Sequence, residues 1–145
     1  MVQETLSIAE QGTHMQRTSV NPWPWSVKLG YDQGQVLAGA TRHLTCSGQT
    51  AVDAQGHPQH EGNMRAQIGL ALDNLEAVLT AAGMSLANLT RLAIYATDMD
   101  AALQNFDMIG ARLGSAGVSP PMTLLGVTRL ALPALMIEIE ASAAD

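Results

Sequence analysis

The sequence predicts an α+β domain in which two helices cover one face of a mixed, mainly antiparallel sheet. Alternation of apolar and polar residues, typical of strands, appears before, between and after two stretches with the three-and-four spacing of amphipathic helices. The order is therefore strands, helix, strand, helix, strands. At 145 residues the chain is long enough for one core and too short for two, so we expect a single domain, residues 1–145.

The first residues carry little pattern. Residues 1–20 are polar, and we expect an N-terminal arm or a short edge strand there, with the core formed by residues 21–145. The core begins with both tryptophans, Trp23 and Trp25, which alternate with prolines that favour an extended backbone. Rigid aromatic side chains in such a loop either line a pocket or cover one end of the core.

Strands are predicted at residues 35–38 and 42–49, around a turn at residues 39–40, and again at residues 90–97. The first helix should begin at Asn63, a suitable N-cap, and end at Gly83.

A second helix should follow a cap at Asp98 and end near Gly114. Its apolar stripe would consist of Leu103, Phe106, Leu113 and either Ile109 or Gly110.

The last quarter of the chain, residues 119–143, predicts the closing strands. Two prolines precede an alternating run at residues 123–129, and after a turn a second strand alternates apolar residues with Glu138 and Glu140. The two carboxylates would lie about 7 Å apart on one face of that strand. Such a row is either a solvated sheet face or a carboxylate in a cleft, placed to orient or deprotonate a water.

Helices on one side leave the second face of the sheet uncovered. We expect that face to carry Met122, Leu124 and Met136, and its apolar character predicts burial against other copies of the chain.

Composition excludes several classes of function. The net charge of −6, with Lys28 as the single lysine, argues against a nucleic-acid partner. No apolar run is long enough to cross a bilayer, no signal peptide is evident, and the single cysteine, Cys46, suits a reducing compartment, so we expect a cytoplasmic protein. His57 and His60 lack further ligands at metal-site spacing, and no phosphate-binding glycine loop is present, so we expect no metal and no cofactor.

Several motifs, in order, resemble the RidA/YjgF family of enamine/imine deaminases over residues 30–143. They are Cys-Ser-Gly-Gln-Thr at residues 46–50, Asp-Asn-Leu-Glu-Ala-Val-Leu followed by Ala-Ala-Gly at the end of the first helix, Tyr-Ala-Thr-Asp-Met at residues 95–99, Asn105, and Ile-Glu-Ile-Glu-Ala-Ser-Ala at residues 137–143.

The resemblance implies a chorismate-mutase-like fold and a homotrimer with clefts between subunits. It also implies a cofactor-free activity, the hydrolysis of reactive 2-imino or enamine acids to 2-keto acids and ammonia. In this sequence the matching cleft residues are Tyr31, Ser47, Gly48, Asn105 and Glu138, with Glu138 as the residue that positions the attacking water.

One departure from the family pattern affects the substrate. The family carries an arginine that clamps the substrate carboxylate, and here that position holds Met122. We therefore expect a cleft lined by Met122, Tyr31 and either Trp23 or Trp25, with Cys46 and Thr123 as further substrate-binding residues. Such a cleft suits a neutral, apolar carbonyl or imine better than a small amino-acid derivative.

Arg129 cannot replace the arginine, because it would lie on the opposite face of the same strand, whereas Arg42 could reach the cleft from a neighbouring strand. We expect a hydrolase with a non-standard substrate, and the alternative is a non-catalytic trimer that binds a small molecule. A ribonuclease, a label also attached to this family, is disfavoured by the acidic charge.

Overall fold

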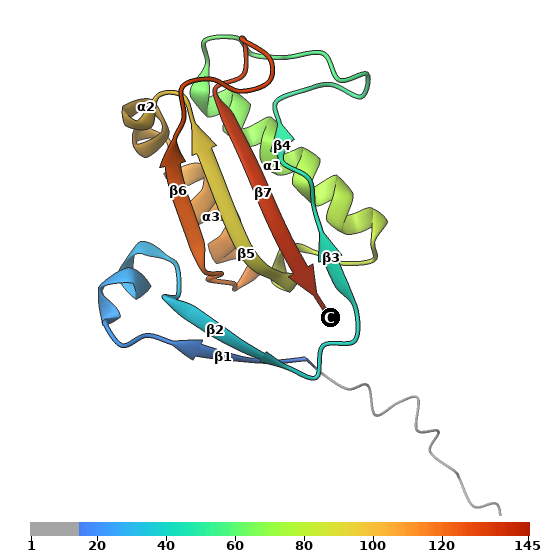
Figure 1. The fold of residues 1–145 in the computed structure, drawn as a ribbon, viewed down its shortest axis with the longest axis vertical. Coiled ribbons are helices and arrows are strands. Elements are labelled where there is room, and N and C mark those ends of the chain that lie inside the picture. The colour runs from blue at the N-terminus through green and yellow to red at the C-terminus, as the bar shows by residue number, and fades with distance from the viewer. Residues whose placement is uncertain (1–14) are drawn as a thin grey trace, which may run out of the picture.

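The fold is built on a five-stranded mixed sheet, which confirms the predicted class (Figure 1). The computed structural model describes residues 15–145, and most of the predicted N-terminal arm lies outside them. The strand order is β3 (His43–Thr45), β7 (Ile137–Ala144), β5 (Leu89–Ala96), β6 (Met122–Gly126), and β4 (Gln49–Thr50) also pairs with β7. The β5–β6 pair is parallel, and the other pairs are antiparallel.

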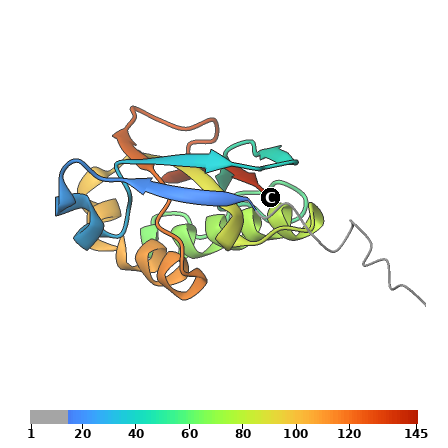
Figure 2. The ribbon, with the colours of Figure 1, turned by 90° about the horizontal axis from the view of Figure 1, so that it is seen from below.

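Two helices, α1 (Met64–Ala81) and α3 (Asp107–Ala116), lie on one side of this sheet, with the sheet's other side free of helices (Figure 2). The predicted first helix is confirmed: the Asn63 side chain accepts a hydrogen bond from the Ala66 amide at 3.0 Å, and Gly83 follows the helix with φ +74°.

Fully buried aliphatic side chains fill the space between helix and sheet. They include Ile68, Leu72, Leu75, Leu92, Ile94, Ile137 and Ile139.

The last strand alternates as predicted. Ile137 and Ile139 are fully buried against the helices, whereas Glu138 is half-buried and Glu140 is exposed on the other face. The open face of the sheet therefore carries a carboxylate pair at its centre, because β7 lies between β3 and β5.

The predicted second helix is two helices. The first is α2 (Met99–Gln104), capped by the Asp98 side chain, which accepts from the Ala101 amide at 3.0 Å. It stops because Asn105 leaves helical geometry (φ −116°) and its side-chain amide donates to the Ala101 carbonyl at 2.8 Å. After this break α3 continues past the predicted end at Gly114 and terminates at Gly117, with φ +67°.

The pairing of the N-terminal strands differs from the prediction. Here β2 (Gly34–Ala38) pairs antiparallel with β1 (Gln16–Val20) in a separate two-stranded ribbon and not with the strand that follows it. Arg17 fixes the ribbon to the main body, since its guanidinium donates to the Ala87 and Leu89 carbonyls. The predicted single strand at residues 42–49 is divided into β3 and β4.

The closing segment is also arranged differently. The strand predicted through residue 129 ends at Gly126, and β5 separates β6 from β7. Met122, Leu124 and Met136 pack against the core beneath the sheet and not on its open face, where we had placed them. For the two residues in β6, the orientation follows from the register between β5 and β6. Met122 pairs with the buried Leu92, so both side chains point toward the helices.

The open face instead presents Tyr95, Thr123, Leu125, Glu138 and Glu140. Leu125 is 50% exposed there. Within residues 15–145, no helix combines the length and apolarity that crossing a membrane would require.

Candidate functional site

A small apolar pocket lies where the 3-10 helix η2 (Pro24–Leu29), the α2–α3 corner and edge strand β6 meet. Its volume is about 310 Å³. The lining residues are Leu29, Tyr31, Leu103, Phe106, Met122 and Leu124. Two predicted site residues, Tyr31 and Met122, therefore meet in one cavity, although they are distant in sequence.

Local structure explains why Tyr31 is placed there. Gly30 ends η2 with φ +90°, a conformation that favours glycine, and turns the chain so that Tyr31 follows directly at the pocket. The Trp25 ring packs edge-on against the Tyr31 ring, with centroids 6.1 Å apart and an interplanar angle of 83°. Trp25 thus braces Tyr31, although Trp25 itself is 55% exposed and does not line the cavity.

Asp32, the next residue, anchors this loop. Its carboxylate is buried and accepts hydrogen bonds from Ser19 Oγ (2.6 Å), Asn21 Nδ2 (2.9 Å) and Gln35 Nε2 (2.9 Å). Burial alone raises the pKa of Asp32, but these three hydrogen bonds and the charge of Arg17 together hold it below its ordinary value. Asp32 is therefore a structural carboxylate that fixes the position of Tyr31.

A second group of predicted residues lies on the open face of the sheet. Glu138 pairs across the ladder with Thr50 and Tyr95, and its side chain lies over Gly48. A Cβ at residue 48 would stand only 2.6 Å from Glu138 Cδ. Gly48 thus leaves the room that the Glu138 carboxylate occupies, which explains why that position lacks a side chain.

The apolar pocket and Glu138 do not meet within one chain. The Met122 side chain points to the helix side, whereas Glu138 points to the open side, and β5 separates their strands. One protomer therefore carries two half-sites: the apolar pocket, and the group of Gly48 and Glu138.

The other predicted site residues lie around these half-sites. Cys46 is 4% exposed in the main core, where burial raises the pKa of its thiol. Ser47 is exposed beside Gly48. Thr123 is on the open face and its hydroxyl accepts from Arg91 Nη2 at 3.2 Å. Trp23 is 61% exposed and does not line the pocket.

Asn105 adjoins the pocket residue Phe106. Its side chain donates to the Ala101 carbonyl and accepts a long contact, 3.5 Å, from Arg65 Nη1. These contacts make Asn105 part of the helix break that brings Phe106 to the pocket.

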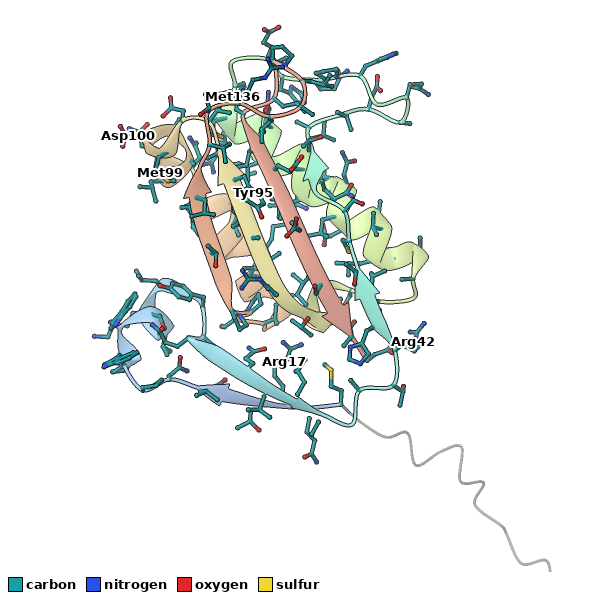
Figure 3. The ribbon with its side chains drawn as sticks, viewed as in Figure 1. Arg17, Arg42, Tyr95, Met99, Asp100 and Met136 are labelled. Carbon is teal, nitrogen blue, oxygen red and sulfur yellow. The ribbon has the colours of Figure 1, made fainter. Side chains whose placement is uncertain are left out.

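Neither Arg42, the proposed replacement for the missing arginine, nor Arg129, which we expected not to replace it, lines the pocket. Arg42 lies beside the C-terminus, across the sheet from β6, and forms an ion pair with Asp145 (Figure 3). Arg129 lies in the loop after β6, not on the strand, and its Nε donates to the Leu130 carbonyl at 3.3 Å.

Four lining residues were not predicted as site residues: Leu29, Leu103, Phe106 and Leu124. Leu103 and Phe106 fit the stripe of a continuous helix, so the sequence pattern assigned them to the core. Only the break at Asn105 turns these two side chains toward η2. Asn105 itself was the one available signal for the break in the sequence.

No group of three or more metal-ligating side chains occurs among residues 15–145. His57 lies 3.6 Å from Asp53 in an exposed turn. A larger, more open hollow of about 560 Å³ lies between α1, α3 and the turn at Ser85, but Arg112 there is held by Asp73 and Glu76. That hollow contains none of the predicted site residues.

Most of this chain matches a known protein family. The family model, described as endoribonuclease L-PSP, matches residues 27–145. A search of curated proteins finds no significant match.

Solved structures give detailed matches. YyfB from Yersinia pestis, a Rid-family protein of unknown function, is 34% identical with a TM-score of 0.77, and the match covers 90% of this chain and 100% of that one. Rv2704 from Mycobacterium tuberculosis, of the YjgF/YER057c/UK114 family, is 26% identical with a TM-score of 0.61 over the same shares of the two chains. TdcF from E. coli, solved with bound serine, is 26% identical with a TM-score of 0.65, covering 79% of this chain and 87% of that one.

Proposed function

Because the chain belongs to the Rid/YjgF/YER057c/UK114 family, we propose that it hydrolyses a reactive imine, an enamine or a related carbonyl compound in a cleft between copies of the chain. The observation that carries the proposal is the Glu138 carboxylate, which lies over Gly48 on the open face of the sheet. A carboxylate in this position can orient and deprotonate a water without a metal or cofactor.

The chemistry is simple to balance. Glu138 accepts a proton from water as the water oxygen bonds to the imine carbon, and the imine nitrogen gains a proton. The resulting carbinolamine then breaks its C–N bond as its nitrogen gains a proton and its hydroxyl loses one, which releases ammonia and leaves a carbonyl group. An enamine first becomes an imine by gaining a proton at its β-carbon and losing one from its nitrogen. The bond changes in every step need only an acid or base that is placed to transfer a proton.

The proposal includes a homotrimer. In its support, the open face of the sheet has no helix over it, presents Leu125 at 50% exposure, and carries Glu138 apart from the pocket of the same chain. Packing this face against another copy would bury it, and the proposed cleft would combine Glu138 of one copy with the pocket of another. The single cysteine suits the proposed cytoplasmic setting.

Ribonuclease activity, named in the family model, is not part of the proposal. The net charge is −6, and most of the arginines are bound to carboxylates or backbone carbonyls. Such a surface gives little attraction to a phosphate backbone.

The test is ammonia release from freshly generated imines, compared between Glu138→Gln and Glu140→Gln. Both residues lie on the same face of β7, but only Glu138 lies over Gly48. We expect Glu138→Gln to lower the catalysed rate at least ~100-fold, the scale of a lost general base, and Glu140→Gln to change it less than ~3-fold.

Light scattering provides the control, since wild type and both variants should have the mass of three 15.3 kDa chains. Equal rates for Glu138→Gln and wild type would contradict the role of Glu138, and a monomeric wild type would contradict the shared cleft.

The composition of the pocket favours a second candidate function, the binding of a small molecule without catalysis. Apart from the Tyr31 hydroxyl, its lining offers no acid, base or nucleophile, and one relative of known structure, TdcF, was solved with bound serine. We therefore keep a non-catalytic trimer that binds a small molecule as the alternative. Thermal stabilisation by a ligand, with no turnover of any imine, would favour it.

A further inference from the structure

Within one chain, no charged residue lines the apolar pocket. Five of its six lining residues are wholly apolar, and the Tyr31 hydroxyl is the single polar group in the sixth. A carboxylate placed there would lose its hydration without gaining a cation or several hydrogen bonds, which is strongly unfavourable.

No cation of this chain compensates. All seven Lys and Arg residues lie within the described residues 15–145, and none lines the pocket. Three arginines are paired with carboxylates: Arg42 with Asp145, Arg65 with Asp107, and Arg112 with Asp73 and Glu76.

The remaining four cations are placed elsewhere. Arg17 donates to the Ala87 and Leu89 carbonyls, and Arg129 to the Leu130 carbonyl. Arg91 bonds Thr123 on the opposite face of β6 from Met122. Lys28 is exposed on η2, next to the lining residue Leu29 but not in the lining.

The shape and surroundings of the pocket favour an apolar occupant. Its volume of about 310 Å³ is at the small end of the ligand-pocket range, enough for a ring or a branched aliphatic group. Phe106 and Tyr31 offer aromatic surfaces, and Met122 can adapt its shape to the occupant. Leu29 and Leu103 in the lining are 65% and 56% exposed, so apolar surface continues to the pocket mouth.

On the premise of the function proposed above, we propose that this pocket binds the uncharged aromatic or branched aliphatic end of the substrate. The substrate class is then imines or enamines of neutral carbonyl compounds, and not 2-imino acids. Met122 is the specificity-determining residue, because it puts an apolar thioether into the lining at the position where the family pattern has an arginine. Tyr31 supplies one hydrogen bond, and Trp25 holds the Tyr31 ring in place.

Binding can be measured without turnover, using two probes of nearly equal shape, phenylacetamide and phenylacetate. Trp23 and Trp25 are the only tryptophans, so Trp23→Phe leaves Trp25, which contacts Tyr31, as the sole source of tryptophan fluorescence. In this background we expect the amide to bind at least tenfold more tightly than the carboxylate. Met122→Arg should reverse the order, and Val36→Arg, which adds the same charge at an exposed position of β2, should leave it unchanged.

Even if Met122→Arg fails to fold, the preference of the pocket with Met122 for phenylacetamide over phenylacetate is enough to test the proposed substrate class. Equal or tighter binding of phenylacetate would overturn it, as would the absence of binding by either probe at millimolar concentration. If Val36→Arg also reversed the order of the two affinities, the cause would be the net charge of the protein and not the pocket, and the proposed role of Met122 would be overturned. Loss of hydrolysis with the amide preference intact would contradict only the proposed reaction.

Discussion

In the proposed function, one residue on each side of the sheet determines what the site can do. On the helix side Met122 makes the pocket uncharged, and on the open side Gly48 leaves room for the Glu138 carboxylate. Both effects are steric or electrostatic consequences of one side chain. Each can therefore be tested by one substitution.

Gly48→Ala should remove activity by displacing Glu138. The new Cβ would lie 2.6 Å from Glu138 Cδ and 2.8 Å from Oε2, so the flexible carboxylate has to swing away. We expect a rate loss of at least ~10-fold with a stability cost of only about 1 kcal/mol, since a side-chain end yields more easily than backbone. Ammonia-release rates and urea denaturation measure the two effects.

Gly110→Ala is the matched control for that substitution. Gly110 lies within α3, and a Cβ there would meet nothing within 4 Å. It should raise stability by about 0.5–1 kcal/mol through helix propensity and leave the rate unchanged. Full activity in Gly48→Ala would contradict the role assigned to the contact between Gly48 and Glu138.

Sequence reasoning at this scale was strongest where a residue's environment follows from strand alternation. The outward orientation of Glu138 was predicted in that way, whereas Gly48 was singled out as a site residue only through the family resemblance. The opposite facing of Met122 was not predicted, because it depends on which residue of β5 it pairs with. Register between distant strands leaves no mark in a single strand's pattern.

At the scale of elements, the ribbon of β1 and β2 positions one wall of the pocket. Asp32 ties this ribbon to the loop that carries Tyr31, since its carboxylate bonds Ser19 of β1 and Gln35 of β2, and its amide donates to the Ser119 carbonyl at 3.0 Å. The pocket wall is therefore only as stable as this buried carboxylate network.

Asp32→Asn should destabilise the protein by about 1–3 kcal/mol at pH 7, because an amide cannot accept all three hydrogen bonds. The pKa of Asp32 is held below its ordinary value in the folded protein. Its stabilising contribution is therefore complete above the unfolded-state pKa of about 3.9 and is lost as pH falls through the lower, folded-state pKa.

Urea denaturation at pH 7 and at stepwise lower pH checks this prediction. The difference between wild type and Asp32→Asn should shrink as the wild-type carboxyl takes up its proton. Glu61→Gln, at an exposed residue, should behave as wild type throughout. A difference that grows on acidification would show that the network does not favour the charged carboxylate.

The elements themselves were largely predictable, and their partners were not. The helix after Asn63 and the strand at residues 90–97 have strong periodicity and a clear cap or turn, so both were predicted closely. The pairing of β2 with β1 was missed because residues 16–20 have little apolar pattern. The break at Asn105 was missed because a broken helix keeps nearly the same apolar spacing as a continuous one.

At the scale of the whole molecule, the fold follows from the order of elements, and the family resemblance is confirmed by the match over residues 27–145. The single-domain assignment stays a prediction, as do the roles of the site residues. Within one chain the two half-sites lie on opposite faces of the sheet. The account therefore requires that the working unit be an assembly, with chemistry from Glu138 and selectivity from the pocket around Met122.

The most direct measurement is ammonia release by wild type and Met122→Arg from two substrates, 2-iminobutanoate and the neutral ketimine of acetophenone, each corrected for spontaneous hydrolysis. The account predicts that wild type prefers the neutral ketimine, and that Met122→Arg gains at least ~10-fold on 2-iminobutanoate while losing rate on the ketimine, as expected for a new bidentate carboxylate contact. Adding Glu138→Gln should abolish both activities. A wild type that hydrolyses 2-iminobutanoate as fast as Met122→Arg would contradict the account.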